Sequence, residues 1–515
     1  MLTVYTTSDL IDALRTLIAT PDQLDDWVTI CDLSDGDPLP SAYHLKVTAR
    51  EGIVHPVDWY NLLPPYLMPE YLPYRTEILL ALLYQRLGNY EQAYRLLADH
   101  SVLLNDIDLI NRLQQGLETD PASLTSDFQP FEEYRFCHNS AVLHHYGSPD
   151  PAAGGDKARY FYREALKAAP DAEYHAFTTR QYAILLADAG ELTQAAHVLE
   201  EAVRLQPSAD AQAELKAGLT QIWMLQLAVP YDAVLLETLK HTLWEVLQHY
   251  RLRGREVEEA MVLVDAAQIA NYADSFAESL GYINRAVELL READLPELLA
   301  QAHYRRGILL YTWAQQGQPQ FFRSALDSFQ ETMKVFTRED APALFAEIHQ
   351  YLGVIYAEMP DEPQKRAIWA GVSASAFQTA LAFFTREDYP YEYARICAQY
   401  ANALNQYPDA VHTDNRQKAL AYYQESLAIR TATRWPVERA VTLLNYVGTA
   451  WHLNLTDNAA AEALYGEMVA MAREARDLTD DPKIISEAVL HLSKLNQLRD
   501  TLAEGPHTAA SPTNN

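Results

Sequence analysis

The sequence predicts an all-α protein, a right-handed α-solenoid of stacked antiparallel helical hairpins. Helical periodicity runs from about Ser8 to Leu502, without a convincing alternating strand pattern. A small residue is repeatedly followed four positions later by a bulky one, at Ala93/Leu97, Ala158/Tyr162, Ala195/Leu199, Ser279/Ile283, Ala325/Phe329, Ser373/Phe377, Ala419/Tyr423 and Ala461/Tyr465. The small residue admits a neighbouring helix and the bulky one fills the groove a turn later, so the recurrence indicates stacking.

Composition narrows the classes of partner. The 515 residues include 40 Lys and Arg against 70 Asp and Glu, a formal charge of −30, and 49% are hydrophobic. Such a surface repels phosphate backbones and anionic lipid headgroups, so we expect no nucleic-acid and no membrane binding. The same charge steers basic partners, and we expect the partner to be a neutral or basic segment.

Cysteine usage and the start of the chain predict a cytoplasmic protein. Cys31, Cys137 and Cys397 are odd in number and far apart, which does not suit a disulfide framework. The first residues have neither a basic segment nor a long apolar run, so they do not read as a signal peptide. No stretch has the length of uncharged apolar sequence that a bilayer span requires.

The N-terminal part is the least regular. Residues 1–73 are predicted to form an irregular helical region with short helices at Asp9–Ile18 and Ala42–Arg50. A Pro/Tyr-rich connector at Asn61–Arg75 follows. Its prolines do not fit inside helices, so we expect it to cross between packed elements in extended form.

Residues 74–208 are predicted to form hairpin repeats. Gly88 and Gly190 each stand where a first helix ends, the place of a left-handed cap. A variant hairpin between them has its loop enlarged at Gly147–Lys157. Residues 209–259 match the repeat poorly and are predicted to be an atypical hairpin or adaptor.

Residues 260–503 resume the repeats with a longer period. Pro342, Pro390 and Pro436 follow one another at intervals of 48 and 46 residues, and each suits the first turn of a helix. The last helical stretch alternates apolar and charged faces like a capping helix. The tail, residues 504–515, is small and polar and is predicted to be disordered.

At these residues the chain resembles a tetratricopeptide-repeat protein. The family's first-helix pattern is matched by Tyr351-Leu352-Gly353 with Tyr356, by Tyr446-Val447-Gly448 with Trp451, and by Gly307 with Tyr311. The usual period is 34 residues. The longer period here is similar to the extended repeats of large bacterial tetratricopeptide proteins and of kinesin light chains.

The resemblance implies a concave groove lined by the first helices. Groove-facing candidates are Tyr304, Trp313, Gln350, Gln399, Gln406, Tyr407, Asn445, Thr449 and His452. An amide side chain both donates and accepts, so a ladder of amides can pair with an extended peptide backbone, as in kinesin light chains. The alternative is that these amides satisfy one another or fill contacts between helices.

Other clusters of polar residues are weaker candidates for a functional site. Cys137, His138, His144 and His145 offer two ligands per helix face about two turns apart, too far for one zinc ion. Arg251, Arg253 and Arg255 suit a phosphate or an acidic peptide, but also the end of a helix. We expect no catalytic residue, cofactor or metal, because no carboxylate pair has a recognisable nucleophile or supporting His.

The predicted function is therefore a non-enzymatic scaffold that binds a peptide or partner protein on its concave groove. The alternative is a regulatory or inhibitory subunit of a separate protease, NTPase or toxin, docking through the loops at Gly147–Lys157 and Pro360–Lys365. An enzyme on a helical scaffold ranks third. Homo-oligomerisation stays open, because repeat arrays with incomplete caps can stack end to end.

Overall fold

The computed structural model describes residues 2–504 except 20–21, 34–43, 51, 56, 61–62, 125–129, 149–150, 229–230, 409–413 and 454–457. The predicted disordered tail, residues 504–515, lies outside this description from residue 505 onward. The chain divides into two compact units, Met1–Ala273 (unit 1) and Asp274–Asn515 (unit 2). This boundary lies C-terminal to the predicted adaptor at 209–259.

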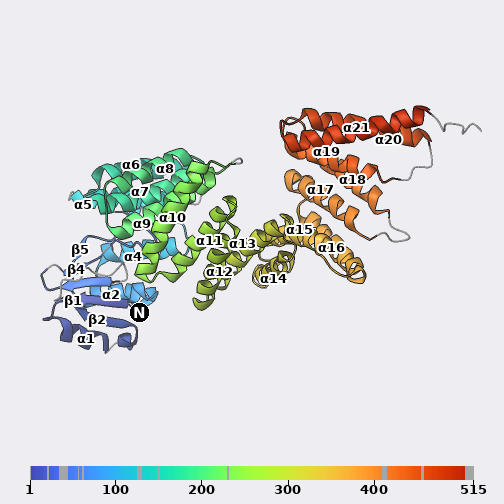
Figure 1. Cartoon of the computed structure of the whole chain (residues 1–515). Coiled ribbons are helices and arrows are strands. Elements are labelled where there is room, and N and C mark those ends of the chain that lie inside the picture. The colour runs from blue at the N-terminus through green and yellow to red at the C-terminus, as the bar shows by residue number, and fades with distance from the viewer. Residues whose placement is uncertain are drawn as a thin grey trace, which may run out of the picture. The chain divides into compact units, whose positions relative to one another are not determined.

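Unit 1 begins with a five-stranded sheet (Figure 1). Its elements are β1 (Leu2–Thr6), α1 (Ile11–Ala19), β2 (Val28–Asp32), β3 (His44–Thr48), β4 (Gly52–Val54) and β5 (Tyr71–Leu72), with a 3₁₀ turn at Leu24–Asp26. The strand order is β2-β1-β3-β4-β5; β1 pairs parallel with β2 and β3, and the other pairs are antiparallel.

The sheet corrects the interpretation of this region as irregular and helical. The helix predicted at Asp9–Ile18 is confirmed as α1, but the one predicted at Ala42–Arg50 is wrong, because β3 occupies His44–Thr48. Leu2, Val4 and Thr6 are buried on one face of β1. Each strand has only two to five residues, so its alternation is too short to stand out against helical periodicity.

Most of the remainder of unit 1 is helical. The helices are α2 (Thr76–Arg86), α3 (Tyr90–Leu96), α4 (Ser101–Gln114), α5 (Pro130–Tyr146), α6 (Pro151–Ala168), α7 (Ala172–Asp188), α8 (Leu192–Arg204), α9 (Ala209–Gln226), α10 (Ala233–Arg253) and α11 (Glu256–Tyr272), with a 3₁₀ turn at Pro121–Ser123. The pairs α2/α3, α5/α6, α7/α8 and α9/α10 each pack together, and α10 also packs on α11. Gly88 and Gly190 end their helices with φ of 78° and 77°, which confirms the predicted left-handed caps.

Unit 2 continues in the same way. Its helices are α12 (Phe276–Glu292), α13 (Pro296–Gln315), α14 (Phe321–Met333), α15 (Pro342–Glu358), α16 (Pro363–Phe383), α17 (Pro390–Gln406), α18 (Asn415–Ile429), α19 (Pro436–Ala450), α20 (Asn458–Asp477) and α21 (Pro482–Glu504). The hairpins are α13/α14, α15/α16, α17/α18 and α19/α20, and α21 packs against α19 and α20. Pro342, Pro390 and Pro436 each open a helix, as predicted.

Both segments that were predicted as enlarged loops contain the start of a helix. α6 already begins at Pro151, inside Gly147–Lys157, and α16 begins at Pro363, inside Pro360–Lys365. A proline is well tolerated at the first helical position, where its missing N–H leaves no bond unmade. The turn-forming residues of these segments therefore stand at the start of a helix rather than within a long loop.

The small and bulky pairs have the role that the sequence predicts. Seven bulky members are at most 1% exposed: Leu97, Tyr162, Leu199, Ile283, Phe329, Phe377 and Tyr423. The exception is Ala461/Tyr465, where the alanine is exposed and the tyrosine half-buried. Burial of these side chains between adjacent helices supplies much of the stacking free energy.

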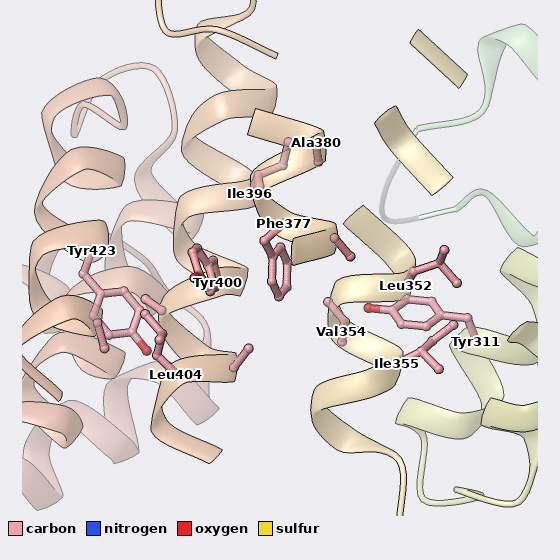
Figure 2. Close-up of a cluster of buried hydrophobic side chains, with 14 of the residues drawn as sticks. Tyr311, Leu352, Val354, Ile355, Phe377, Ala380, Ile396, Tyr400, Leu404 and Tyr423 are labelled. Atoms are coloured by element: carbon pink, nitrogen blue, oxygen red, sulfur yellow. The ribbon is translucent and has the colours of Figure 1, made fainter. Parts of the chain in front are cut away.

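Close approach of helices is visible around Phe377. Figure 2 shows its ring between Tyr400 and the Leu352–Ile355 turn. The ring stacks on Tyr400 at a centroid distance of 4.9 Å. A Cβ atom added to Gly353 would lie 2.8 Å from the same ring, and one added to Gly307 would lie 2.7 Å from Phe329. Glycine on the first helix thus makes room for an aromatic ring on the second.

Candidate functional site

A hollow of about 410 Å³ lies in unit 1. Most of its lining belongs to α7, α9 and α11. The first two are the first helices of the hairpins α7/α8 and α9/α10, and α11 is the helix that follows α10. Its walls are largely apolar, formed by Ala183, Ile184, Ala187, Leu199, Ala217, Gly218, Ile222, Leu225, Met261 and Val262. Leu225 is 65% exposed, and Ile184 and Met261 are each 39% exposed. Apolar side chains facing solvent around a concavity are typical of a binding site.

The floor of the hollow is a buried polar network centred on Glu214. This side chain is 3% exposed and accepts hydrogen bonds from Arg255 at 2.7 Å and from the Tyr250 hydroxyl at 2.9 Å. Arg180 forms an ion pair with its other oxygen at 3.0 Å. A buried carboxylate with these partners is well compensated for the loss of water.

Arg255 joins this network to a distant part of the chain. It also pairs with Glu258 at 2.8 Å, donates to the Trp59 carbonyl at 3.5 Å, and lies over the rings of Tyr60 and Tyr250 at 4.2 and 4.6 Å. Burial lowers the pKa of its guanidinium, but the attraction of the two carboxylates outweighs burial and raises that pKa above its ordinary value. Arg255 is therefore a permanent cation held in one orientation.

The segment that Arg255 contacts lies against the same helices. The described residues 57–60 and 63–72, which we name the strap, contact α5 and α7. The Asn139 side chain on α5 donates to the Leu67 carbonyl and accepts from the Leu67 N–H, both at 2.8 Å. His138 bonds the Pro65 carbonyl at 2.7 Å. This face of unit 1 thus binds irregular backbone through an amide side chain.

Three apolar or aromatic side chains anchor the strap. Trp59 is 4% exposed, packs edge-on against Phe177 at 5.5 Å, and donates from Nε1 to Glu173 at 2.6 Å. The Tyr66 hydroxyl donates to buried Asp106 at 2.6 Å, and Leu67 is 8% exposed. As predicted for the connector, none of its described residues from Leu63 to Arg75 is helical.

The groove residues predicted from the sequence all lie in unit 2. Trp313, Gln350 and Thr449 are 2%, 1% and 4% exposed, so they lie inside the helix packing. Trp313 packs against Phe276 and Phe321. Burial keeps these three side chains from a ligand in this conformation.

The other six side chains are more accessible. Among them, Gln399 and Tyr407 take part in hydrogen bonds with side chains of the same unit. Gln350 donates to Gln399 at 2.6 Å and accepts from Arg395 at 3.0 Å. The Tyr407 hydroxyl donates to Ser373 at 2.7 Å. Tyr304, Gln399, Tyr407 and Asn445 are partly buried, whereas Gln406 and His452 are exposed. The structure therefore joins Gln350 and Gln399 by one hydrogen bond, with Arg395 on the Gln350 oxygen, and the binding role of these residues stays a prediction.

The basic run near the end of α10 is used internally. Arg251 pairs with Glu259 at 2.7 Å and Arg253 with Asp210 at 3.0 Å, while Arg255 holds Glu214. The run therefore ties α10 to α9 and α11. All three guanidinium groups have carboxylate partners within the chain.

The predicted histidine cluster is part of the helix packing. His138 is fully buried and bonds Thr178 at 2.9 Å, His144 stacks on Phe161, and His145 bonds the Tyr162 hydroxyl at 3.1 Å. Among the described residues, no three His, Cys, Asp or Glu side chains are placed to hold a metal ion. Within the same part of the chain, no helix has the length and apolarity to cross a bilayer.

His138 should make unit 1 sensitive to acid. Burial lowers its pKa to about 4, so between pH 6.5 and 4 the unfolded state binds more protons than the native state. The stability due to neutral His138 is full above pH 6.5 and is lost as the pH falls, by about 3 kcal/mol in total. We expect His138→Gln to flatten this part of the urea-midpoint profile. His241→Gln, at an exposed position of α10, should leave the profile unchanged; equal slopes in both variants would contradict the assignment.

The stacked hairpins make the chain an α-solenoid, a helical-repeat protein. Two of the three first-helix glycines that carry the resemblance to tetratricopeptide repeats, Gly307 and Gly353, face Phe329 and Phe377 on second helices, whereas the space beside Gly448 is open. No family model and no curated protein matches the sequence.

Several solved helical-repeat structures are similar. They include YrrB, a TPR protein with an unusual peptide-binding site (TM-score 0.29, 17% identity, 43% of this chain and 91% of that chain), and yeast Tom70 (0.33, 12%, 82% of each). Another is the APC/C hetero-tetramer Cut9-Hcn1 (0.34, 14%, 84% and 88%). These likenesses are too low to bear on function.

Proposed function

We propose that the chain is a non-enzymatic scaffold that binds a segment of another protein in the hollow of α7, α9 and α11. The observation that carries this proposal is the hollow itself, about 410 Å³ with an apolar rim above a polar floor whose charges are paired. This volume lies within the range of about 300–1,000 Å³ that is usual for binding pockets. Partly exposed Leu225, Ile184 and Met261 would gain by burial against a partner.

The polar floor supports recognition rather than catalysis. Glu214 is engaged by Arg180, Tyr250 and Arg255, so its carboxylate serves the fold. Burial raises the pKa of the Tyr250 hydroxyl above its ordinary value, and the neighbouring Glu214 carboxylate raises it further. Tyr250 therefore remains a neutral hydrogen-bond donor at physiological pH. A rigid floor with fixed donors favours one bound geometry of a partner.

The test is a pull-down from native lysate read by mass spectrometry, with wild type beside Leu225→Asp. Leu225 is on the rim and 65% exposed, so the substitution should leave the fold intact while placing a charge in the apolar contact. We expect one stoichiometric partner with wild type and its loss in Leu225→Asp. The matched control is Leu252→Asp on α10, at a side chain that is 86% exposed and outside the hollow; it should retain the partner.

A second arm tests the residues predicted from the sequence. Gln399→Glu in unit 2 keeps the oxygen that Gln350 bonds and adds a charge to the accessible end of the amide pair. A partner lost in Gln399→Glu but retained in Leu225→Asp would move the site to unit 2. Absence of any partner would contradict the scaffold function.

A further inference from the structure

The contacts of the strap show how α5 and α7 hold a non-helical segment. Asn139 bonds both the N–H and the carbonyl of Leu67, while Trp59 and Leu67 bury their side chains between helices. The backbone bonds are independent of side-chain identity, and the buried anchors select for apolar or aromatic residues. The strap reaches Arg255, which also lines the hollow.

The hollow offers the same kind of anchoring site. Ile184, Leu225 and Met261 form an apolar rim, and Gln221 on α9 places an amide beside it. The Gln221 side chain donates to Asp265 on α11. An aliphatic or aromatic side chain seated on this rim would bury apolar surface, with the amide next to its backbone.

The charged residues that line the hollow favour a partner of positive charge. The lining contains two guanidinium groups and three carboxylates, so its net charge is −1. The guanidinium groups are those of Arg180 and Arg255, and the carboxylates are those of Glu214, Glu258 and Asp265. Both guanidinium groups are paired with Glu214. Glu258 also pairs with Arg255, and Asp265 accepts a hydrogen bond from Gln221. An anionic ligand would have to displace the Glu214 pairs, whereas a cation can add to the Asp265 and Glu258 carboxylates beside their present partners. The formal charge of −30 on the chain steers cations in the same direction.

We propose that the hollow binds an extended peptide segment in which an aliphatic or aromatic side chain adjoins a lysine or arginine. The apolar side chain sits among Ile184, Leu225 and Met261, and the basic side chain pairs with Asp265. This inference rests on the proposed scaffold function and adds the chemistry of the partner.

The probe is a phage-displayed library of random dodecapeptides, selected on the immobilised full-length chain. The enriched peptides are then synthesised and titrated by fluorescence anisotropy. We expect enrichment of peptides that place Lys or Arg beside Leu, Ile, Phe or Tyr. Asp265→Lys reverses the local charge and should weaken their binding by at least ~tenfold. Glu237→Lys makes the same charge change at an exposed position on α10 and should change the affinity less than twofold.

The outcomes separate this inference from the function on which it rests. Acidic peptides that bind wild type but not Leu225→Asp would overturn the basic-partner inference and leave the scaffold function standing. Peptides that bind both proteins equally would overturn the assignment of the hollow as the site. A selection that enriches no peptide overturns the inference, and the pull-down then decides the proposed function independently.

Discussion

Glu214→Ala should destabilise unit 1 by about 3–5 kcal/mol, because it leaves two buried or partly buried cations without their shared carboxylate. Arg255 is 5% exposed and lies against the strap, so it has little access to water as a substitute. Urea unfolding of the full chain followed by circular dichroism gives the total loss. Hydrogen exchange of the α9 and α11 amides assigns that loss to unit 1.

The matched control is Glu245→Ala. Glu245 also forms an ion pair, with Lys216 at 2.9 Å, but its side chain is 43% exposed. Because a surface pair contributes ~0–1 kcal/mol, we expect a small effect. Glu214→Ala and Glu245→Ala with equal costs would show that the Glu214 network does not hold unit 1 together.

Phe377→Ala should cost unit 2 about 3–5 kcal/mol, since it removes a fully buried ring and leaves a cavity. The ring fills the space above Gly353 and stacks on Tyr400 (Figure 2). The same urea unfolding experiment measures this loss, and hydrogen exchange of the α15 and α17 amides should place it in unit 2.

A double-mutant cycle tests the close approach itself. Gly353→Ala alone should destabilise unit 2, because the added methyl group overpacks the contact at a cost of about 1–3 kcal/mol. The higher helix propensity of alanine offsets ~0.5–1 kcal/mol of this cost. In the Phe377→Ala background the added methyl group has room, so the same substitution should become stabilising. Gly448→Ala is the control, because beyond the backbone of its own helix turn nothing lies within 4 Å of the added Cβ. Unchanged sign in the two backgrounds would contradict the contact between Gly353 and Phe377.

The helical part of the fold was predictable because its signals are long and repeat. Gly88 and Gly190 mark left-handed caps, and Pro342, Pro390 and Pro436 mark helix starts. The N-terminal sheet was not predictable in this way. Its strands are short, and β1 is joined to its parallel neighbours β2 and β3 by pairings between separate segments. Such long-range pairing leaves no local period in the sequence.

The candidate site was less predictable than the fold. Position relative to a repeat glycine picked out Gln350 and Gln399, and the hydrogen bond between them fits the alternative that the amides satisfy one another. One wall of the hollow is α9, which belongs to the segment 209–259 that matches the repeat poorly, so α9 offered no register from which to place Glu214. No local signal in the sequence singles out Glu214, because Asp210, Gln212 and Lys216 stand close to it. Its partners come from α7 and from the start of α11, and only the fold brings them together.

The strap has a consequence for how unit 1 forms. Repeat arrays usually contact only their neighbours and can grow hairpin by hairpin. Here the Arg255 side chain bonds the Trp59 carbonyl across 196 residues of sequence. At a synthesis rate of ~5–20 residues per second, this contact waits about 10–40 s after Trp59 has been made. The environment of Trp59 is therefore completed only after the chain has been synthesised as far as the start of α11.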